Sequence, residues 1–216
     1  MGQREILHLD EIQDFIKYLK NFIIDIEICS DNITQIIEAQ KEININPIQD
    51  FLGHYVYLAF SQCAINCYKL FQKKEKRSFY SLCNKIHEFE YSSELREHLT
   101  KNEDKDDGLV KNRREFRQLA DEMLDKIGEE ADLINKINDR RLTFYAHSDP
   151  TKRVESETLA EIKALGEFAK KLFNMIYNRF LGVEFLFNIN LASISQVLID
   201  RKMVDDYWKS REEEEL

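Results

Sequence analysis

The chain has 216 residues, a formal net charge of −9 at pH 7 and an apolar content of 43%. The length fits one folded domain over residues 1–216, and the acidic balance excludes nonspecific attraction of the whole surface to polyphosphate, so any binding of nucleic acid must be local. Only six glycines and two prolines are present, too few for the turns that connect many short strands. We therefore expect an all-α fold.

The sequence has no feature of a membrane or secreted protein. No apolar run approaches the roughly eighteen residues of a membrane span. The N-terminal sequence MGQREILHLDE carries charges where a secretory signal needs an apolar stretch. Ile6 also occupies the position at which a myristoylation signal requires serine or threonine. These observations predict a cytoplasmic protein that does not bind membranes.

The first helix is predicted over about residues 9–40, because apolar residues recur there every three or four positions. A stripe this regular serves either a bundle core or a dimer seam. The sequence NINP (44–47) ends the helix, since proline disfavours helix in the residue before it. A second helix is predicted from about Ile48 to Gln72. A third is predicted from Phe79 to about Phe89, with Ser78 as its N-cap.

In the middle of the chain, a charged segment is followed by a segment with helical spacing of apolar residues. The second half of residues 92–108 is dense in charge and ends in glycine, so residues 100–108 are predicted to form an exposed loop. Helical spacing then runs from Leu109 toward Tyr145, where the sequence HSDP stops it. We expect one long helix over this stretch.

Two helices are predicted after this stop. Thr151 or Ser156 can cap the first of them, and Gly182 closes it. An additional C-terminal helix is predicted over about residues 191–209. The acidic residues that follow, 210–216, are expected to form a solvated tail.

The four cysteines lie among apolar residues in helical spacing, and a cytosolic chain of this size has little need for crosslinks. We expect Cys29, Cys63, Cys67 and Cys83 to be reduced core thiols. An alternative is a zinc site, because Cys63 and Cys67 are four apart, as are Cys83 and His87. Against zinc, a continuous apolar stripe explains Cys63 as packing, and structural zinc sites usually use tighter CxxC turns. We expect neither a metal nor another cofactor.

Three basic segments interrupt the acidic chain: Lys69–Arg77 (KLFQKKEKR), Lys111–Arg117 (KNRREFR) and Lys136–Arg153. Each is a local candidate for nucleic-acid binding. Each is also explained as a solvated helix face.

The third basic segment contains the sequence DRRLTFYAHSDP (139–150). On an ideal helix, Arg140 and Arg141 need not touch His147, which lies seven and six positions later. A second chain across a two-fold axis can complete a site that needs both groups. An imidazole titrating near neutral pH can take a proton from a ribose 2′-hydroxyl or give one to the leaving oxygen, while a guanidinium binds the charge that builds on phosphate. The alternative is a histidine that caps helix carbonyls beside two solvated arginines.

The sequence RLTFYAHSD resembles the Arg-x(4 to 6)-His motif of the HEPN superfamily. The order of the parts, with YLAFSQCAINCYKLF and RSFYSLCNKI before a helix that ends in the motif, is similar to the HEPN proteins of abortive-infection phage-defence systems. The resemblance implies an all-α, up-and-down helical bundle that dimerises, with arginine and histidine in a shared cleft. It also implies metal-independent endoribonuclease activity, with Arg141 and His147 as the catalytic residues.

The chain departs from the family pattern at two positions. Leu142 follows the motif arginine where asparagine, aspartate or histidine is common, and Thr143 is the nearest polar side chain. Some family members pair with an antitoxin that modifies a tyrosine two residues after the histidine. Asp149 stands there in this chain, so that mechanism does not carry over, although Tyr145 lies nearby.

The remaining polar and aromatic residues of the segment are candidate substrate-binding residues, each with an alternative role. Arg140 can face RNA phosphate or pair with an acidic neighbour on an adjoining chain. Asp149 can orient the His147 ring or belong to an Asp-Pro turn. Tyr145 can stack on an unpaired base or lie in the core, and Thr143 can supply a hydroxyl.

The sequence and the resemblance together predict a metal-independent endoribonuclease that cleaves single-stranded RNA at an Arg/His site across a homodimer, as a phage-defence or toxin component. They leave room for an antitoxin or regulatory protein as a partner. Two alternatives stay open: a non-catalytic HEPN-like module that binds RNA, a nucleotide or a partner protein, and a purely structural helical adaptor.

Overall fold

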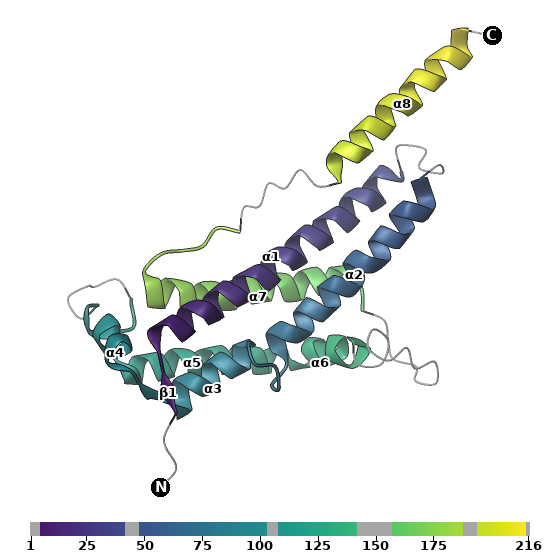
Figure 1. The fold of residues 1–216 in the computed structure, drawn as a ribbon. Helices are drawn as coiled ribbons and strands as arrows, with labels where there is room; N and C mark the ends of the chain where they lie inside the picture. The colour runs from purple at the N-terminus through teal and green to yellow at the C-terminus, as the bar shows by residue number, and fades with distance from the viewer. Residues whose placement is uncertain (1–4, 42–47, 103–107, 142–156, 188–193, 215–216) are drawn as a thin grey trace.

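The computed structural model of the chain describes residues 5–41, 48–102, 108–141, 157–187 and 194–214. These residues form eight helices and two strands of two residues each, which confirms the all-α prediction. In Figure 1 two long helices, α1 (Leu9–Ala39) and α2 (Gln49–Phe71), form a hairpin, and α7 (Leu159–Leu181) lies against α1. No helix in the described part of the chain is long and apolar enough to cross a membrane.

Helix α1 follows the predicted bounds of residues 9–40 closely. Its apolar stripe is buried against α2 and α7 of the same chain, so it serves the core of the bundle. Two polar side chains interrupt this stripe. Ser30 and Asn32 are only 4% and 3% exposed, and Asn32 Nδ2 donates a hydrogen bond to the Tyr55 hydroxyl of α2.

Helices α2 and α3 (Phe79–Glu88) also agree with the predicted bounds. Ser78 is the N-cap of α3 as predicted, and its hydroxyl accepts a hydrogen bond from the Ser81 amide at 3.1 Å. The structure adds a short parallel pairing that the sequence analysis did not predict, between β1 (Ile6–Leu7) and β2 (Glu90–Tyr91). This pairing ties the start of the chain to the residues that follow α3.

Helix α4 (Ser93–Thr100) begins after an N-cap at Ser92. Of the predicted loop 100–108, Lys101 and Gly108 are exposed, and residues 103–107 lie outside the described residues. Asn102 is buried instead, and its side-chain amide donates to the Val110 carbonyl at 3.1 Å.

The long helix predicted from Leu109 toward Tyr145 is wrong in two respects. It begins later, as α5 (Arg113–Glu129), because the Asn112 side chain caps the Glu115 amide and the chain before it is not helical. It also breaks at Glu130, where φ is −98° and ψ is 15°, before α6 (Ala131–Arg140). Gly128, just before the break, is a poor helix former because it has no Cβ to restrict the backbone.

Helix α7 is buried along the predicted apolar face and ends at Gly182, whose φ of 77° is the left-handed value that favours glycine at a helix end. Its N-cap is Thr158, not the predicted Thr151 or Ser156, which lie outside the described residues. The Thr158 hydroxyl accepts from the Glu161 amide at 3.2 Å, and the Glu161 carboxylate accepts from the Thr158 amide at 2.7 Å. This capping box satisfies two amides that the helix leaves free.

Replacing Thr158 with alanine should lower the free energy of unfolding by about 1 kcal/mol, because the Glu161 amide loses its acceptor. Urea unfolding followed by circular dichroism measures this loss. Thr158→Ser keeps the hydroxyl and should restore nearly all of the stability. Equal stability of the alanine variant and the native protein would contradict the capping role.

Helix α8 (Ser195–Glu214) confirms the additional C-terminal helix but extends through most of the tail that was expected only to be solvated. It projects away from the bundle in Figure 1. Ile194 and Leu198 pack with Ile36 and Leu52, where α1 ends and α2 begins. The rest of the predicted apolar face is largely outside the core, since Met203 is 66% exposed.

Candidate functional site

The two elements that flank the motif segment are joined by two ion pairs. Lys136 Nζ of α6 lies 2.7 Å from the Glu161 carboxylate, and Arg140 Nε lies 3.5 Å from the Glu157 carboxylate. Lys136 and Arg140 are four residues apart in α6, so their side chains lie on the same side of that helix. Glu157 and Glu161, at the start of α7, have the same spacing. The end of α6 is therefore held next to the start of α7.

Arg140 and Glu157 form the more deeply buried of these pairs. The side chains are 17% and 1% exposed. A carboxylate this deeply buried is costly without a cation beside it. Of the two roles considered for Arg140, the geometry favours pairing with an acidic neighbour, but the neighbour is Glu157 of the same chain.

Arg141, the next residue, has a different environment. It is the C-cap of α6, and its guanidinium carbon lies 4.2 Å from the centre of the Tyr68 ring of α2. Within the described residues the Arg141 guanidinium has no carboxylate partner. A guanidinium stacked by its face on a ring keeps its N–H edge available as a fork of hydrogen-bond donors. Such a fork matches the two oxygens of a phosphate.

The rest of the predicted site lies outside the described residues: Leu142, Thr143, Tyr145, His147 and Asp149. The structure thus places the two arginines and separates their environments. That Arg141 and His147 share one cleft stays a prediction. Tyr68 and Glu157, the partners of the arginines, were not identified from the sequence. Tyr68 lies far from Arg141 along the chain. Glu157 appears in the sequence as one acidic residue among many.

The structure disfavours the zinc alternative, because two of its four side chains, Cys63 and His87, make other contacts. The Cys63 thiol points to the Ile26 carbonyl of α1 at 3.7 Å, and His87 Nε2 lies 3.1 Å from the Asp121 carboxylate of α5. No group of three histidine, cysteine, aspartate or glutamate side chains suited to a metal occurs among the residues that the structure describes.

All four cysteines are free thiols, and they differ in burial: Cys29 is half-buried and the other three are buried. A hydrogen bond from Cys63 lowers the pKa of Cys29, which is half-buried, and the same contact raises the pKa of Cys63. Burial raises the pKa of Cys67 and of Cys83 to about 12. Only the thiolate is a good nucleophile, so the four thiols should react at different rates.

At pH 8, iodoacetamide should alkylate Cys29 at least about tenfold faster than the other three thiols in the folded protein, as mass spectrometry of tryptic peptides would show. In guanidinium chloride all four should react at similar rates, which controls for peptide detection. Alkylation of Cys67 or Cys83 at the rate of Cys29 in the folded state would contradict the buried environment that the structure gives them.

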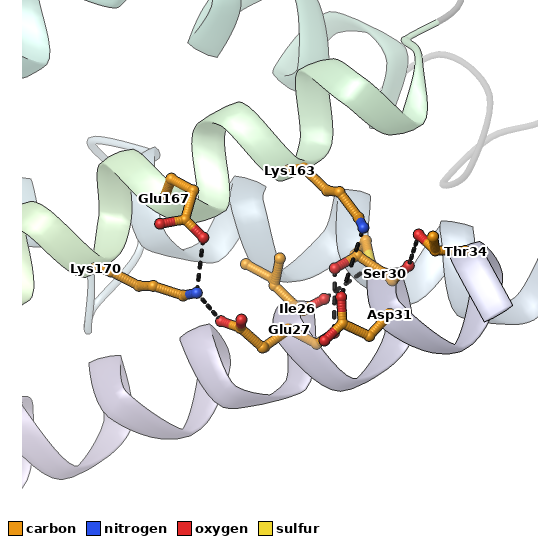
Figure 2. Close-up of polar contacts among 9 residues, drawn as sticks. Ile26, Glu27, Ser30, Asp31, Thr34, Lys163, Glu167 and Lys170 are labelled. Carbon is orange, nitrogen blue, oxygen red and sulfur yellow. Dashed lines mark hydrogen bonds and ion pairs between the residues drawn. The ribbon is translucent and has the colours of Figure 1, made fainter. Parts of the chain in front are cut away.

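A second polar cluster lies between α1 and α7, and Figure 2 shows it. Lys170 pairs with Glu27 and with Glu167, the latter at 2.8 Å, and Lys163 lies 3.5 Å from Asp31. Burial lowers the pKa of Lys170, but its hydrogen bonds to the carboxylates of Glu167 and Glu27 outweigh this effect, so the net pKa is raised. Each lysine of α7 thus pairs with a carboxylate of α1, which suits a structural link between the helices.

Helices α1 and α7 also approach closely beside this cluster. A Cβ on Gly166 would lie 3.2 Å from Cγ2 of Ile26, tighter than an ordinary van der Waals contact. The Ser30 hydroxyl, which is nearly buried, donates to the Glu27 carbonyl at 3.1 Å within α1. Because these polar groups bond to one another, the cluster offers less to a ligand than Arg141 does.

Comparison with known proteins gives no further assignment. No protein-family model matches the chain, and no curated protein or solved structure shows a significant match.

Proposed function

We propose that the protein is a metal-independent endoribonuclease of the HEPN type that cleaves single-stranded RNA, with Arg141 and His147 as its catalytic residues. The observation that carries the proposal is the contrast between the two adjacent arginines. Arg140 is tied to the buried Glu157, whereas Arg141 stacks on Tyr68 and has no carboxylate partner within the described residues. In a chain with a net charge of −9, such a cation is suited to an anionic ligand.

The chemistry follows from the two residue types. The His147 imidazole takes the proton of a ribose 2′-hydroxyl, the 2′-oxygen bonds to phosphorus, and the bond to the 5′-oxygen breaks as that oxygen receives a proton. The Arg141 guanidinium binds the charge that builds on the phosphoryl oxygens. The products are a 2′,3′-cyclic phosphate and a 5′-hydroxyl. A homodimer would supply each group twice, so that Arg141 of one chain can serve a cleft with His147 of the other.

The test is cleavage of a fluorescent single-stranded RNA in the presence of EDTA. The native protein should cut it and leave 2′,3′-cyclic phosphate ends, which acid treatment opens to a monophosphate. His147→Ala, purified in the same way, should be inactive and so exclude a contaminating nuclease. His147→Ala with full activity would overturn the mechanism.

A second function is favoured by one specific residue. Leu142 stands where active members of the HEPN superfamily commonly have a polar side chain, which favours a non-catalytic module that binds RNA, a nucleotide or a partner protein. RNA binding without cleavage at any protein concentration would support this second function. The proposed role in phage defence or as a toxin belongs to the first function, the endoribonuclease. The proposed antitoxin or regulatory partner belongs to it as well.

A further inference from the structure

The end of α2 and the connection to α3 carry an unusual concentration of positive charge. Residues 69–77 contain five cations and one carboxylate, Glu75, in a chain that is strongly acidic overall. We call the five cations, Lys69, Lys73, Lys74, Lys76 and Arg77, the basic cluster. All except Lys69 are exposed, and Lys69 is half-buried.

The basic cluster is not neutralised by the protein itself. Within the described residues none of its five cations has an ion pair with a carboxylate. Other cations on the surface do have one, as Lys85 does with Glu11 at 2.7 Å and Arg179 with Glu122 at 2.7 Å. Two carboxylates, Glu11 and Asp14, line the same hollow as Lys76 and Arg77, and Glu11 is paired with Lys85. The cluster therefore keeps a clear positive excess.

Three of these cations are held in place by aromatic rings instead. The Arg77 guanidinium carbon lies 3.4 Å from the centre of the Tyr18 ring. Lys73 Nζ lies 5.3 Å from the Tyr80 ring, and Lys69 Nζ lies 5.1 Å from the Phe22 ring. A cation over a ring loses side-chain freedom but keeps its N–H donors. The rings thus orient the cations in advance, which reduces the entropy lost when they bind an anion.

The basic cluster begins next in sequence to the residue of α2 that contacts Arg141. Tyr68, which stacks on Arg141, immediately precedes Lys69 in α2. We infer that the basic cluster binds the phosphate backbone of the RNA whose cleavage is proposed for Arg141 and His147. This inference rests on the proposed function for the choice of RNA. Contacts from lysine and arginine to phosphate bind without regard to base sequence and weaken as salt rises.

The test uses four neutralising changes, Lys73→Gln, Lys74→Gln, Lys76→Gln and Arg77→Gln, made together. The matched control carries the same charge change on exposed cations outside the three basic segments: Arg96→Gln, Lys126→Gln, Lys171→Gln and Lys202→Gln. Both variants also carry His147→Ala so that RNA stays intact. Fluorescence anisotropy with a single-stranded RNA of about twenty nucleotides measures affinity across a salt series.

The cluster variant should bind RNA at least about tenfold more weakly than the His147→Ala protein, and its slope of log affinity against log salt should fall by about 3. The control should stay within about twofold. Equal weakening in both variants, or no weakening in the cluster variant, would overturn the inference. Equally tight binding of polyglutamate of the same charge would overturn the assignment to RNA. Urea unfolding of both variants checks that they fold.

A separate measurement keeps this result distinct from the proposed function. With His147 intact, the cluster variant should cleave a dinucleotide at the native rate but a long RNA more slowly at limiting substrate, because only the long RNA reaches the cluster. A native protein that binds RNA through the cluster and cuts neither substrate would refute the proposed function and leave the inference standing.

Discussion

Replacing Arg141 with alanine should lower the rate of RNA cleavage in EDTA by about 10²- to 10³-fold, the usual cost of removing one donor to a transition-state oxyanion. The free energy of unfolding should change by less than about 1 kcal/mol, because among the described residues the guanidinium contacts the Tyr68 ring and pairs with no carboxylate. Cleavage is measured by gel and stability by urea unfolding. The combination matters more than either value, since loss of activity through misfolding would lower both.

Two further variants separate charge from geometry at this position. Arg141→Lys keeps the charge but loses the planar fork of donors, so its activity should lie between those of the native protein and the alanine variant. Tyr68→Leu keeps the arginine and removes the ring that holds it. Its cleavage rate should fall less than that of Arg141→Ala. Native cleavage by Arg141→Ala would show that the guanidinium does not contact the reacting phosphate.

Most of the fold was predictable because its signal repeats along the chain. The spacing of apolar residues in α1 and α7 continues over more than five turns, so a small error at one position does not alter the assignment. The break at Glu130 has no repeated signal of this kind in the sequence. The apolar spacing continues across it, and the change in direction depends on one backbone conformation and on what the next helix packs against.

The start of α7 had a readable signal that was assigned to the wrong residues. The cap was predicted at Thr151 or Ser156, whereas Thr158 with Glu161 forms the Ser/Thr-x-x-Glu pattern of a capping box. The pairing of β1 with β2 could not be predicted in this way. Two residues are too few to show an alternating pattern, and their pairing depends on contacts between distant parts of the chain.

The candidate site was predicted only in part, for a similar reason. The resemblance assigns Arg141 to catalysis, but the sequence leaves the role of Arg140 open and names no partner within the chain for either arginine. Their difference comes from tertiary contacts: Glu157 at the start of α7 takes Arg140, and Tyr68 of α2 takes Arg141. The zinc alternative also depended on tertiary contacts that the sequence does not show. Helical spacing put Cys63 and Cys67 on related faces, but those faces turn into the core toward other helices.

Under the proposed function, these contacts divide the work of the two arginines between stability and chemistry. Two ion pairs hold α6 against α7 on either side of the segment that contains His147. Arg140 belongs to the deeper of the two pairs, so its charge is used in keeping this corner of the bundle together. Arg141 can then be presented for function without weakening the fold. Replacing Arg140 should therefore affect the free energy of unfolding far more than the rate of cleavage.

Replacing Arg140 with alanine should lower the free energy of unfolding by about 3 kcal/mol, because the Glu157 carboxylate, 1% exposed, loses its guanidinium partner. Arg179→Ala breaks the more exposed pair with Glu122 and should cost no more than about 1 kcal/mol, which makes it the matched control. Adding Glu157→Gln to Arg140→Ala removes the buried charge and should recover part of the loss. At a temperature where it remains folded, Arg140→Ala should cleave RNA within about threefold of the native rate. A stable Arg140→Ala that has lost cleavage would reverse the roles assigned to the two arginines.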